Sequence, residues 1–302
     1  MASAEFDNVI ALLAASPLTP ANTMHEIRAG VDGLGLLVPP VEGATTAAVD
    51  AGGVPGLWVA MGEAPAADDA ESAVILHFHG GGYVMASSHT HVGMLSRLAA
   101  SSGGRVLSVD YRLAPEDPFP AAPLDAMSAY RWLLDSGVAA VRIVVAGDSA
   151  GGGLALGLLV AARDAGLPQP AGALLMSPWV DLTGSGATVL ANAAIDPILG
   201  PLLLQHWATL YAGDSLGDPL ASPLFADLAD LAPITTQVGE REVLLDDAVR
   251  LTERVITAGG TATLAVWDEM THWWHLFAGL IPEADRAIDE LAAYARQVTT
   301  TA

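Results

Sequence analysis

The sequence contains no cysteine and no lysine, although it runs to 302 residues. Without cysteine the chain has no disulfides, no thiolate metal site and no cysteine nucleophile. Without lysine it has no P-loop lysine, no Schiff-base lysine and no Ser-Lys dyad. The twelve basic residues are all arginines and face 34 acidic residues, which gives a formal net charge of −22. This charge argues against nucleic acid and against an anionic membrane surface as partners.

Long hydrophobic runs are also missing, since no apolar stretch approaches the length of a membrane span. Residues 1–16 carry acids and lack the basic region that begins a secretory signal. We therefore expect a cytoplasmic protein without a membrane partner. Hydrophobic residues make up 52% of the chain and charged residues 15%, which predicts a globular fold with a sizeable core.

Short apolar segments alternate with helical patterns from Ala73 onward. This alternation predicts an α/β fold, with a mostly parallel sheet and helices on both faces. Strands are expected at 45–49, 56–61, 74–78, 105–110, 141–145, 173–177, 234–238 and 262–267. Helices are expected at 91–100, 124–134, 154–160, 246–258 and 282–297, and residues 64–71 are expected to form a loop.

Two segments lie outside this alternation. Residues 1 to about 45 contain two helical patterns, the second at 19–28, and residues 183 to about 230 contain a Leu-rich helix pattern at 197–211. Because apolar pockets need a cover and loops at this sheet edge carry function, we predict that both segments form a cap. The chain would then be a single domain, 1–302, and the alternative is an insertion without function.

The pentapeptide Gly147–Gly151 (GDSAG) follows the apolar strand segment 141–145 and leads into an apolar helix pattern. Strand, G-x-S-x-G and helix in this order are typical of a nucleophile elbow, where glycine on either side of the serine avoids collisions of Cβ atoms. We predict Ser149 as a nucleophile at a helix N-terminus, which directs free N–H groups toward the reaction centre. A Gly-rich turn without chemistry is the alternative, since the chain holds 31 glycines.

A nucleophilic serine needs a base and an acid that orients the base, and in this topology the order is Ser, Asp or Glu, then His. Three histidines follow Ser149, namely His206, His272 and His275. His272 lies just beyond the expected strand 262–267, at the edge where α/β active sites assemble, and is the predicted base. His275 is the second choice, and His206 falls in the expected cap helix.

The acid is expected after the strand 234–238, where four carboxylates compete: Glu240, Glu242, Asp246 and Asp247. Asp246 and Asp247 suit the cap and first turn of the next helix, where the dipole favours acids. Glu242 is followed by apolar residues that would bury it, and we choose it as the acid. A solvated loop carboxylate is the alternative interpretation.

The run His79-Gly80-Gly81-Gly82 follows the expected strand 74–78. Negative charge that develops on a substrate oxygen needs rigid donors, and backbone N–H groups without side chains in the way serve best. We predict an oxyanion hole made by the N–H groups of Gly80, Gly81 and Ala150. The histidine of this run is expected to bond the loop's own backbone.

Several motifs in this order resemble the hormone-sensitive-lipase-like (bacterial type IV) esterases of the α/β-hydrolase fold: HGGGYV, YRLAPEDPFPAA, GDSAGGG, SPWVDLT, VGEREVLLDDAVRL and EMTHWWHLF. The resemblance covers about Ala73 to the C-terminus. It implies an eight-stranded α/β-hydrolase fold with a helical cap, and a serine carboxylesterase that needs no cofactor. Because the expected cap is small, we predict short- to medium-chain esters as substrates. The resemblance places Ser149 on the nucleophile, His272 on the base and the same three amides on the oxyanion hole. Many relatives carry Asp where this chain has Glu242, and either carboxylate can orient an imidazole.

Three alternatives stay open. A lactonase or amidase would use the same triad, so the expected partner is a small-molecule ester or lactone. A ligand-binding receptor without catalysis is expected to lack the base, whereas His272 is present. Metal hydrolysis would need a third ligand beside a histidine pair, and no metal is expected. The pairs with suitable spacing are His77 and His79, His89 and His91, and His272 and His275. The sequence leaves a homodimer open.

Overall fold

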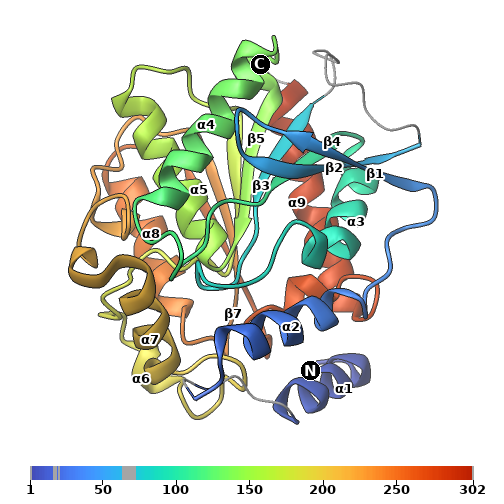
Figure 1. Ribbon diagram of the computed structural model, residues 1–302, viewed down its shortest axis with the longest axis vertical. Coiled ribbons are helices and arrows are strands. Elements are labelled where there is room, and N and C mark those ends of the chain that lie inside the picture. Colours follow the sequence, from blue (N-terminus) through green and yellow to red (C-terminus); the bar gives the residue numbers. More distant parts are fainter. Residues whose placement is uncertain (1, 16–18, 20, 63–72, 301–302) are drawn as a thin grey trace.

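The computed structural model describes residues 2–15, 19, 21–62 and 73–300. An eight-stranded sheet runs through the molecule in the order β1-β2-β4-β3-β5-β6-β7-β8 (Figure 1). β1 pairs with β2, and β2 with β4, in antiparallel orientation. The strands β3 to β8 all run parallel to one another. The strands are β1 (Ala44–Asp50), β2 (Pro55–Met61), β3 (Val74–Phe78), β4 (Arg105–Val109), β5 (Ile143–Asp148), β6 (Gly172–Met176), β7 (Ile234–Gly239) and β8 (Ala262–Trp267). The mostly parallel sheet predicted from the sequence is confirmed, while the loop expected at 64–71 lies outside the described residues.

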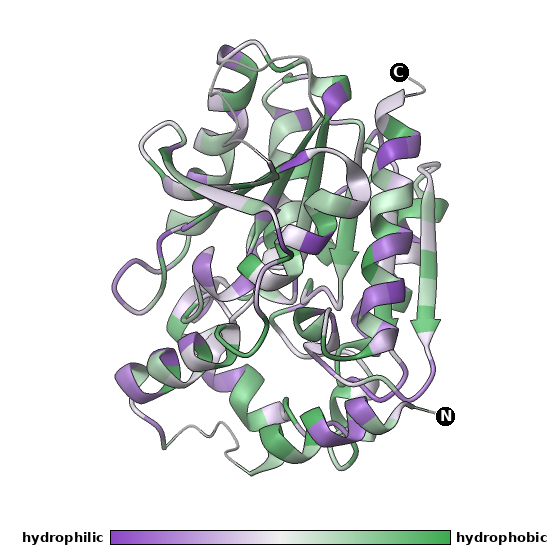
Figure 2. Cartoon of the chain, turned by 90° about the vertical axis from the view of Figure 1, so that its right-hand side faces the viewer, coloured by the Kyte–Doolittle hydropathy of each residue, from purple (hydrophilic) through white to green (hydrophobic). Residues whose placement is uncertain are grey.

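Helices cover both faces of this sheet, which is why β3, β4, β5 and β6 are buried at every position. One face is covered by α4 (Ala121–Asp135), α5 (Ala150–Asp164) and α8 (Leu245–Thr257). The other is covered by α3 (Val92–Ser102) and α9 (Pro282–Thr300). Figure 2 shows the resulting pattern, with apolar strands inside and helices banded by hydrophilic residues. No helix in the described ranges is both long enough and apolar enough to cross a membrane.

Four further helices gather at one end of the molecule (Figure 1). They are α1 (Ala4–Ala14), α2 (Met24–Gly35), α6 (Thr188–Ala191) and α7 (Pro201–Ala212). Arg28 of α2 donates to the carbonyl oxygens of Val84 and Ala114, at 2.8 and 3.0 Å. Tyr211 of α7 stacks on Tyr83 with ring centroids 3.8 Å apart. Two of the helices expected to form a cap, α2 and α7, therefore contact the segment that follows β3.

Some helix boundaries differ from those expected, each for a local reason. α2 begins at Met24 because Thr23 and Glu26 form a capping box there. α7 begins four residues later than expected, with Pro201 in the first turn, where a missing N–H costs nothing. In contrast, α5 begins at Ala150, immediately after Ser149, as expected for a nucleophile at a helix N-terminus.

Candidate active site

Ser149 occupies a sharp turn between β5 and α5. Its backbone has φ 52° and ψ −120°, a conformation that is rare for a residue with a side chain. A Cβ atom at Gly147 would lie 2.2 Å from the carbonyl oxygen of Gly151, and one at Gly151 would lie 1.9 Å from that of Phe78. Only glycine fits at either position. The sequence thus forces Ser149 into the strained geometry of a nucleophile elbow.

Ser149, His272 and Glu242 form a continuous hydrogen-bonded chain. Nε2 of His272 lies 2.9 Å from the Ser149 Oγ, and Nδ1 lies 2.8 Å from Oε2 of Glu242. All three side chains are buried. Burial lowers the pKa of His272, but the contact with Glu242 outweighs this effect and raises the pKa above its ordinary value. The structure therefore brings together the three residues that were predicted from the sequence. His275 and His206 are not part of this series of hydrogen bonds.

The Glu242 carboxylate is held from the side opposite His272. Its Oε1 accepts a hydrogen bond from the Ser177 hydroxyl and another from the Gly239 N–H, both at 2.6 Å. Ser177 itself has φ 47° at the end of β6, so its side chain is fixed by an unusual backbone turn. Ser177 was not among the predicted site residues, although it ends the strand expected at 173–177 and begins the motif SPWVDLT.

The other candidate residues have different partners. Oε2 of Glu240 accepts the Glu269 N–H at 3.1 Å, so this carboxylate bonds the backbone and not His272. His275 lies 3.1 Å from the Gln237 side-chain oxygen, and burial lowers its pKa to about 3. His206 lies on α7, half-buried. Among the described residues, no group of three or more His, Asp or Glu side chains has the arrangement to hold a metal ion.

The glycine loop after β3 requires one correction to the predicted oxyanion hole. The Gly80 N–H is already donated to Oδ1 of Asp148 at 2.9 Å, so it is not free for a substrate. In the part of the chain that the structure describes, no group accepts the N–H groups of Gly81, Gly82 or Ala150. Gly81 has φ 107° and Gly82 has φ 60°, which places both amides in conformations that glycine adopts readily. As expected, the ring of the preceding histidine bonds the loop backbone, with Nδ1 2.7 Å from the Gly80 carbonyl oxygen.

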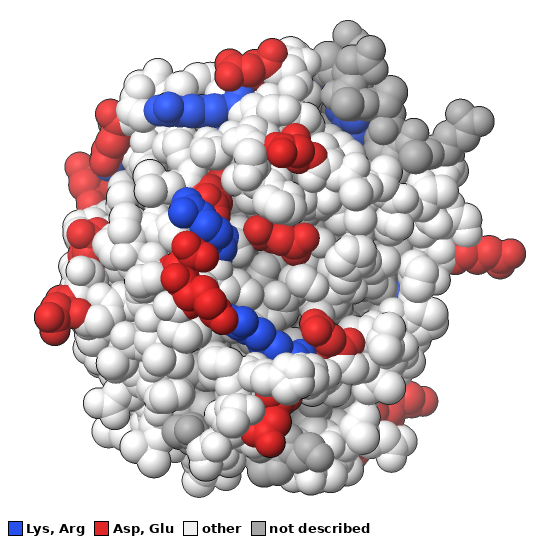
Figure 3. Space-filling model, in the orientation of Figure 1, with Lys and Arg blue, Asp and Glu red and all other residues white. Residues whose placement is uncertain are grey.

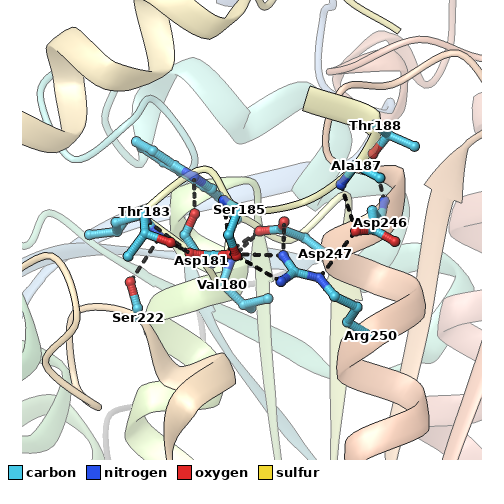
Figure 4. A network of polar contacts seen from close by, with 12 residues as sticks. Val180, Asp181, Thr183, Ser185, Ala187, Thr188, Ser222, Asp246, Asp247 and Arg250 are labelled. Atoms are coloured by element: carbon cyan, nitrogen blue, oxygen red, sulfur yellow. Dashed lines mark hydrogen bonds and ion pairs between the residues drawn. The ribbon is translucent and has the colours of Figure 1, made fainter. Parts of the chain in front are cut away.

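A second polar network joins the chain after β6 to the first turn of α8 (Figure 4). Oδ2 of Asp247 accepts the N–H groups of Val180 and Asp181, both at 3.0 Å. The Arg250 guanidinium lies 2.8 Å from Asp181, 3.1 Å from Asp247 and 3.2 Å from Asp246. Burial, together with the nearby Asp181 carboxylate, raises the pKa of Asp247 to about 7. Asp246 and Asp247 are thus engaged in this network and not with His272.

A cavity of about 260 Å³ lies between α6, α7 and the segment 182–184. Trp179 forms part of its wall, and the Trp179 N–H donates to the Ser149 carbonyl oxygen at 2.8 Å. The wall of the cavity is therefore joined directly to the elbow. A much smaller hollow of about 10 Å³ borders Ser149 and His272, which is room for about one water molecule.

Acidic side chains outnumber basic ones on the face drawn in Figure 3, where several arginines lie beside carboxylates. Two of the ion pairs in the structure are Arg28 with Glu116, 2.7 Å apart, and Arg241 with Glu269, 2.9 Å apart. Both pairs are partly exposed, so each contributes little to stability. In each of them a carboxylate compensates the charge of the arginine.

Comparisons with known proteins agree with this geometry. A family model described as the alpha/beta hydrolase fold matches residues 75–276. An acetyl-hydrolase of Streptomyces hygroscopicus is 43% identical over 236 residues, and an esterase of Acinetobacter venetianus is 35% identical over 236 residues. Each match covers 78% of both proteins. A crystal structure of an esterase from the bacterial hormone-sensitive lipase family has a TM-score of 0.94 at 42% identity, over 99% of both chains.

Proposed function

This chain belongs to the hormone-sensitive-lipase family of esterases with the α/β-hydrolase fold, and we propose that it hydrolyses short- to medium-chain esters through Ser149, His272 and Glu242. The observation that carries this proposal is the chain of hydrogen bonds from Oγ through the imidazole to the carboxylate, at 2.9 and 2.8 Å. Such a chain allows a hydroxyl to lose its proton as it attacks a carbonyl carbon.

In this mechanism His272 takes the proton from Ser149 as the oxygen attacks the ester carbonyl. Glu242 orients the ring and stabilises the imidazolium, and the raised pKa of His272 favours that charged form. The imidazolium then gives the proton to the departing alcohol. A water molecule attacks the acyl-enzyme with the same histidine as its base, and the carboxylic acid leaves.

The oxygen that becomes negative during the attack needs donors that are already in place. The N–H groups of Gly81, Gly82 and Ala150 are free of protein acceptors among the described residues, and we assign the oxyanion hole to them. Gly82 replaces Gly80 in this assignment because the Gly80 N–H is donated to Asp148.

The cavity next to Trp179 supports the preference for short to medium chains. At about 260 Å³ it lies at the small end of ligand-binding cavities, and α6 and α7 form its walls. In the proposed mechanism these helices, together with α1 and α2, act as a cap that shields the acyl group from water. Long-chain esters would exceed this space.

The experiment that tests the proposal is hydrolysis of p-nitrophenyl acetate, butyrate, octanoate and palmitate by the wild type and three variants. We expect activity on the shorter chains, its loss in Ser149→Ala, and a much larger fall in Glu242→Gln than in the matched control Asp246→Asn. Hydrolysis by Ser149→Ala at the wild-type rate would contradict the mechanism. Rates on a lactone measured beside the acetate decide between the ester and the lactone as the preferred substrate.

A further inference from the structure

A buried cluster of polar side chains lies beneath the glycine loop and has no role in the mechanism described so far. Asp148 is 6% exposed, and the His77 and His91 side chains are almost entirely buried. Oδ1 of Asp148 lies 3.2 Å from Nε2 of His91 and 3.4 Å from Nε2 of His77. The cost of burying a carboxylate means that such a cluster needs a physical explanation.

The acceptors around its ring hold His91 as a cation. Nε2 faces the Asp148 carboxylate, while Nδ1 lies 3.2 Å from the carbonyl oxygen of Ser87, which can only accept. Nδ1 also lies 2.7 Å from the Thr90 hydroxyl, whose own hydrogen is donated to the same carbonyl. Both ring nitrogens therefore need a hydrogen. Burial lowers the pKa of His91, but the Asp148 carboxylate, the Ser87 carbonyl and the Asp110 carboxylate together raise it above its ordinary value.

The two histidines beside this pair are neutral, since burial lowers the pKa of His77 and lowers that of His79 to about 3. Asp148 is consequently matched by one cation. Burial alone would raise the pKa of Asp148, but His91 and His77 hold it well below the ordinary value. Asp148 and His91 each carry a charge, and the pair they form has no net charge.

Asp148 also fixes the first peptide of the glycine loop. Its Oδ1 accepts the Gly80 N–H at 2.9 Å. A Cβ atom at Gly80 would lie 2.2 Å from Oδ2, so the carboxylate can approach this peptide only because the residue is glycine. The hydroxyl of Tyr111 holds the other end of the same peptide by donating to the His79 carbonyl oxygen at 2.6 Å. The loop thus begins from a fixed peptide, and the next two amides are the ones left free.

We propose that Asp148 and His91 are positioning residues for the oxyanion hole, in which Asp148 fixes the glycine loop through Gly80 and His91 neutralises the Asp148 charge. This inference rests on the proposed esterase mechanism, because it concerns the oxygen that becomes negative when Ser149 attacks. A lone carboxylate beneath that oxygen would repel the developing charge in a site of low dielectric, whereas a neutral pair does not.

The test is a double-mutant cycle with His91→Gln and Asp148→Asn, in which kcat and KM are measured for p-nitrophenyl acetate. His91→Gln keeps a side-chain N–H but leaves the Asp148 charge unpaired, so we expect kcat to fall about 10- to 100-fold with KM changed less than about threefold. Asp148→Asn keeps an acceptor for Gly80 and should lower kcat less than about tenfold. The double variant removes both charges, and we expect it to be at least about fivefold faster than His91→Gln alone.

Additive losses in the double variant, or a rise in KM without a fall in kcat, would overturn the proposal. Asp125→Asn is the matched control, because Asp125 is also buried, accepts the Arg112 N–H and pairs with the Arg112 guanidinium. Its kcat should stay near the wild-type value.

A second measurement covers the case in which His91→Gln does not fold. A trifluoromethyl ketone forms a hemiketal with the serine and places a negative oxygen in the same hole. Its inhibition constant should rise in Asp148→Asn by the factor by which kcat/KM falls, and a constant that stays unchanged while kcat/KM falls would contradict the proposal. Hydrolysis that survives in Ser149→Ala would instead remove the proposed function itself, so the two failures are distinguishable.

Discussion

Two buried aspartates, Asp148 and Asp247, have similar surroundings but opposite shifts in pKa. Each accepts backbone N–H groups of a neighbouring segment, and each lies beside one cation. The pKa of Asp148 is well below its ordinary value, whereas that of Asp247 is raised to about 7. Burial raises the pKa of both carboxylates. The difference must therefore come from the cation beside each aspartate and from the other groups that this cation contacts.

Arg250 serves three carboxylates, because it contacts Asp181 and Asp246 as well as Asp247. His91, in contrast, faces Asp148 as its one carboxylate contact among the described residues. One-to-one pairing compensates a buried charge, while a shared cation leaves one of the buried carboxylates, here Asp247, under-compensated. The network beneath the glycine loop is therefore suited to holding a fixed charge distribution. The network that joins the segment after β6 to α8 is suited to titration near neutral pH.

The largest effect is expected from Asp148→Ala, which leaves the His91 cation and the Gly80 N–H without their partner. The free energy of unfolding should fall by about 3–5 kcal/mol because a buried charge loses its counter-charge. Because the glycine loop also loses its anchor, kcat for p-nitrophenyl acetate should fall by about 100-fold or more. Urea denaturation and steady-state kinetics measure the two quantities. If kcat stayed within threefold of the wild-type value, whatever the stability of the variant, Asp148 would not anchor the glycine loop and the two networks would not differ as described.

Asp247→Ala should affect stability more than chemistry. It leaves the N–H groups of Val180 and Asp181 without their acceptor, which should lower the free energy of unfolding by about 2–4 kcal/mol. Since neither group touches the reacting atoms, kcat for the acetate should stay within about fivefold of wild type. The same two assays apply. If kcat fell as far as in Asp148→Ala, the two networks would not differ in the way described.

The raised pKa of Asp247 predicts a pH dependence of stability that Asp247→Asn should remove. Between its ordinary value of 3.8 and about 7, the folded protein keeps a proton on Asp247 that the unfolded chain has released. Wild-type stability should therefore fall as pH rises from 5 to 7, by on the order of 2 kcal/mol relative to Asp247→Asn. Urea denaturation of both proteins at pH 5, 6, 7 and 8 measures the difference. A constant difference across these pH values would contradict the raised pKa.

Asp246→Asn should give the smallest effect. The Asp246 side chain is about one quarter exposed, and its pair with Arg250 is accordingly screened by solvent. Asn also keeps an acceptor for the Ala187 N–H, which Asp246 Oδ2 binds at 2.9 Å. The free energy of unfolding should change by less than about 1 kcal/mol, with activity unchanged. A loss as large as that of Asp247→Ala would show that exposure does not separate the members of this network.

The sheet could be predicted from the sequence because its strands are short apolar runs between helical patterns, and the order of motifs selected Ser149, Glu242 and His272. The structure brings these three side chains within hydrogen-bonding distance. These features depend on local patterns or on the order of elements along the chain. The start of α2 was misplaced because the capping box at Thr23 lies inside a longer helical pattern.

The contacts of Gly80 and Ser177 could not be predicted in the same way. Gly80 meets Asp148 across 68 residues of sequence because β3 and β5 are neighbours, with Phe78 paired to Gly147. A glycine-rich run indicates that donors are present, but it does not show which N–H the adjacent strand already binds. Ser177 contacts Glu242 across 65 residues, and nothing in the local sequence indicates this contact.

The most direct test of the account is to react the protein with a fluorophosphonate and locate the modification by mass spectrometry, while hydrolysis of p-nitrophenyl acetate is followed in parallel. The account predicts one phosphonyl group per chain, on Ser149, with hydrolysis lost in proportion to labelling. It also predicts no labelling in Ser149→Ala. Full hydrolytic activity in protein labelled at Ser149, or inactivation through a different residue, would contradict the account.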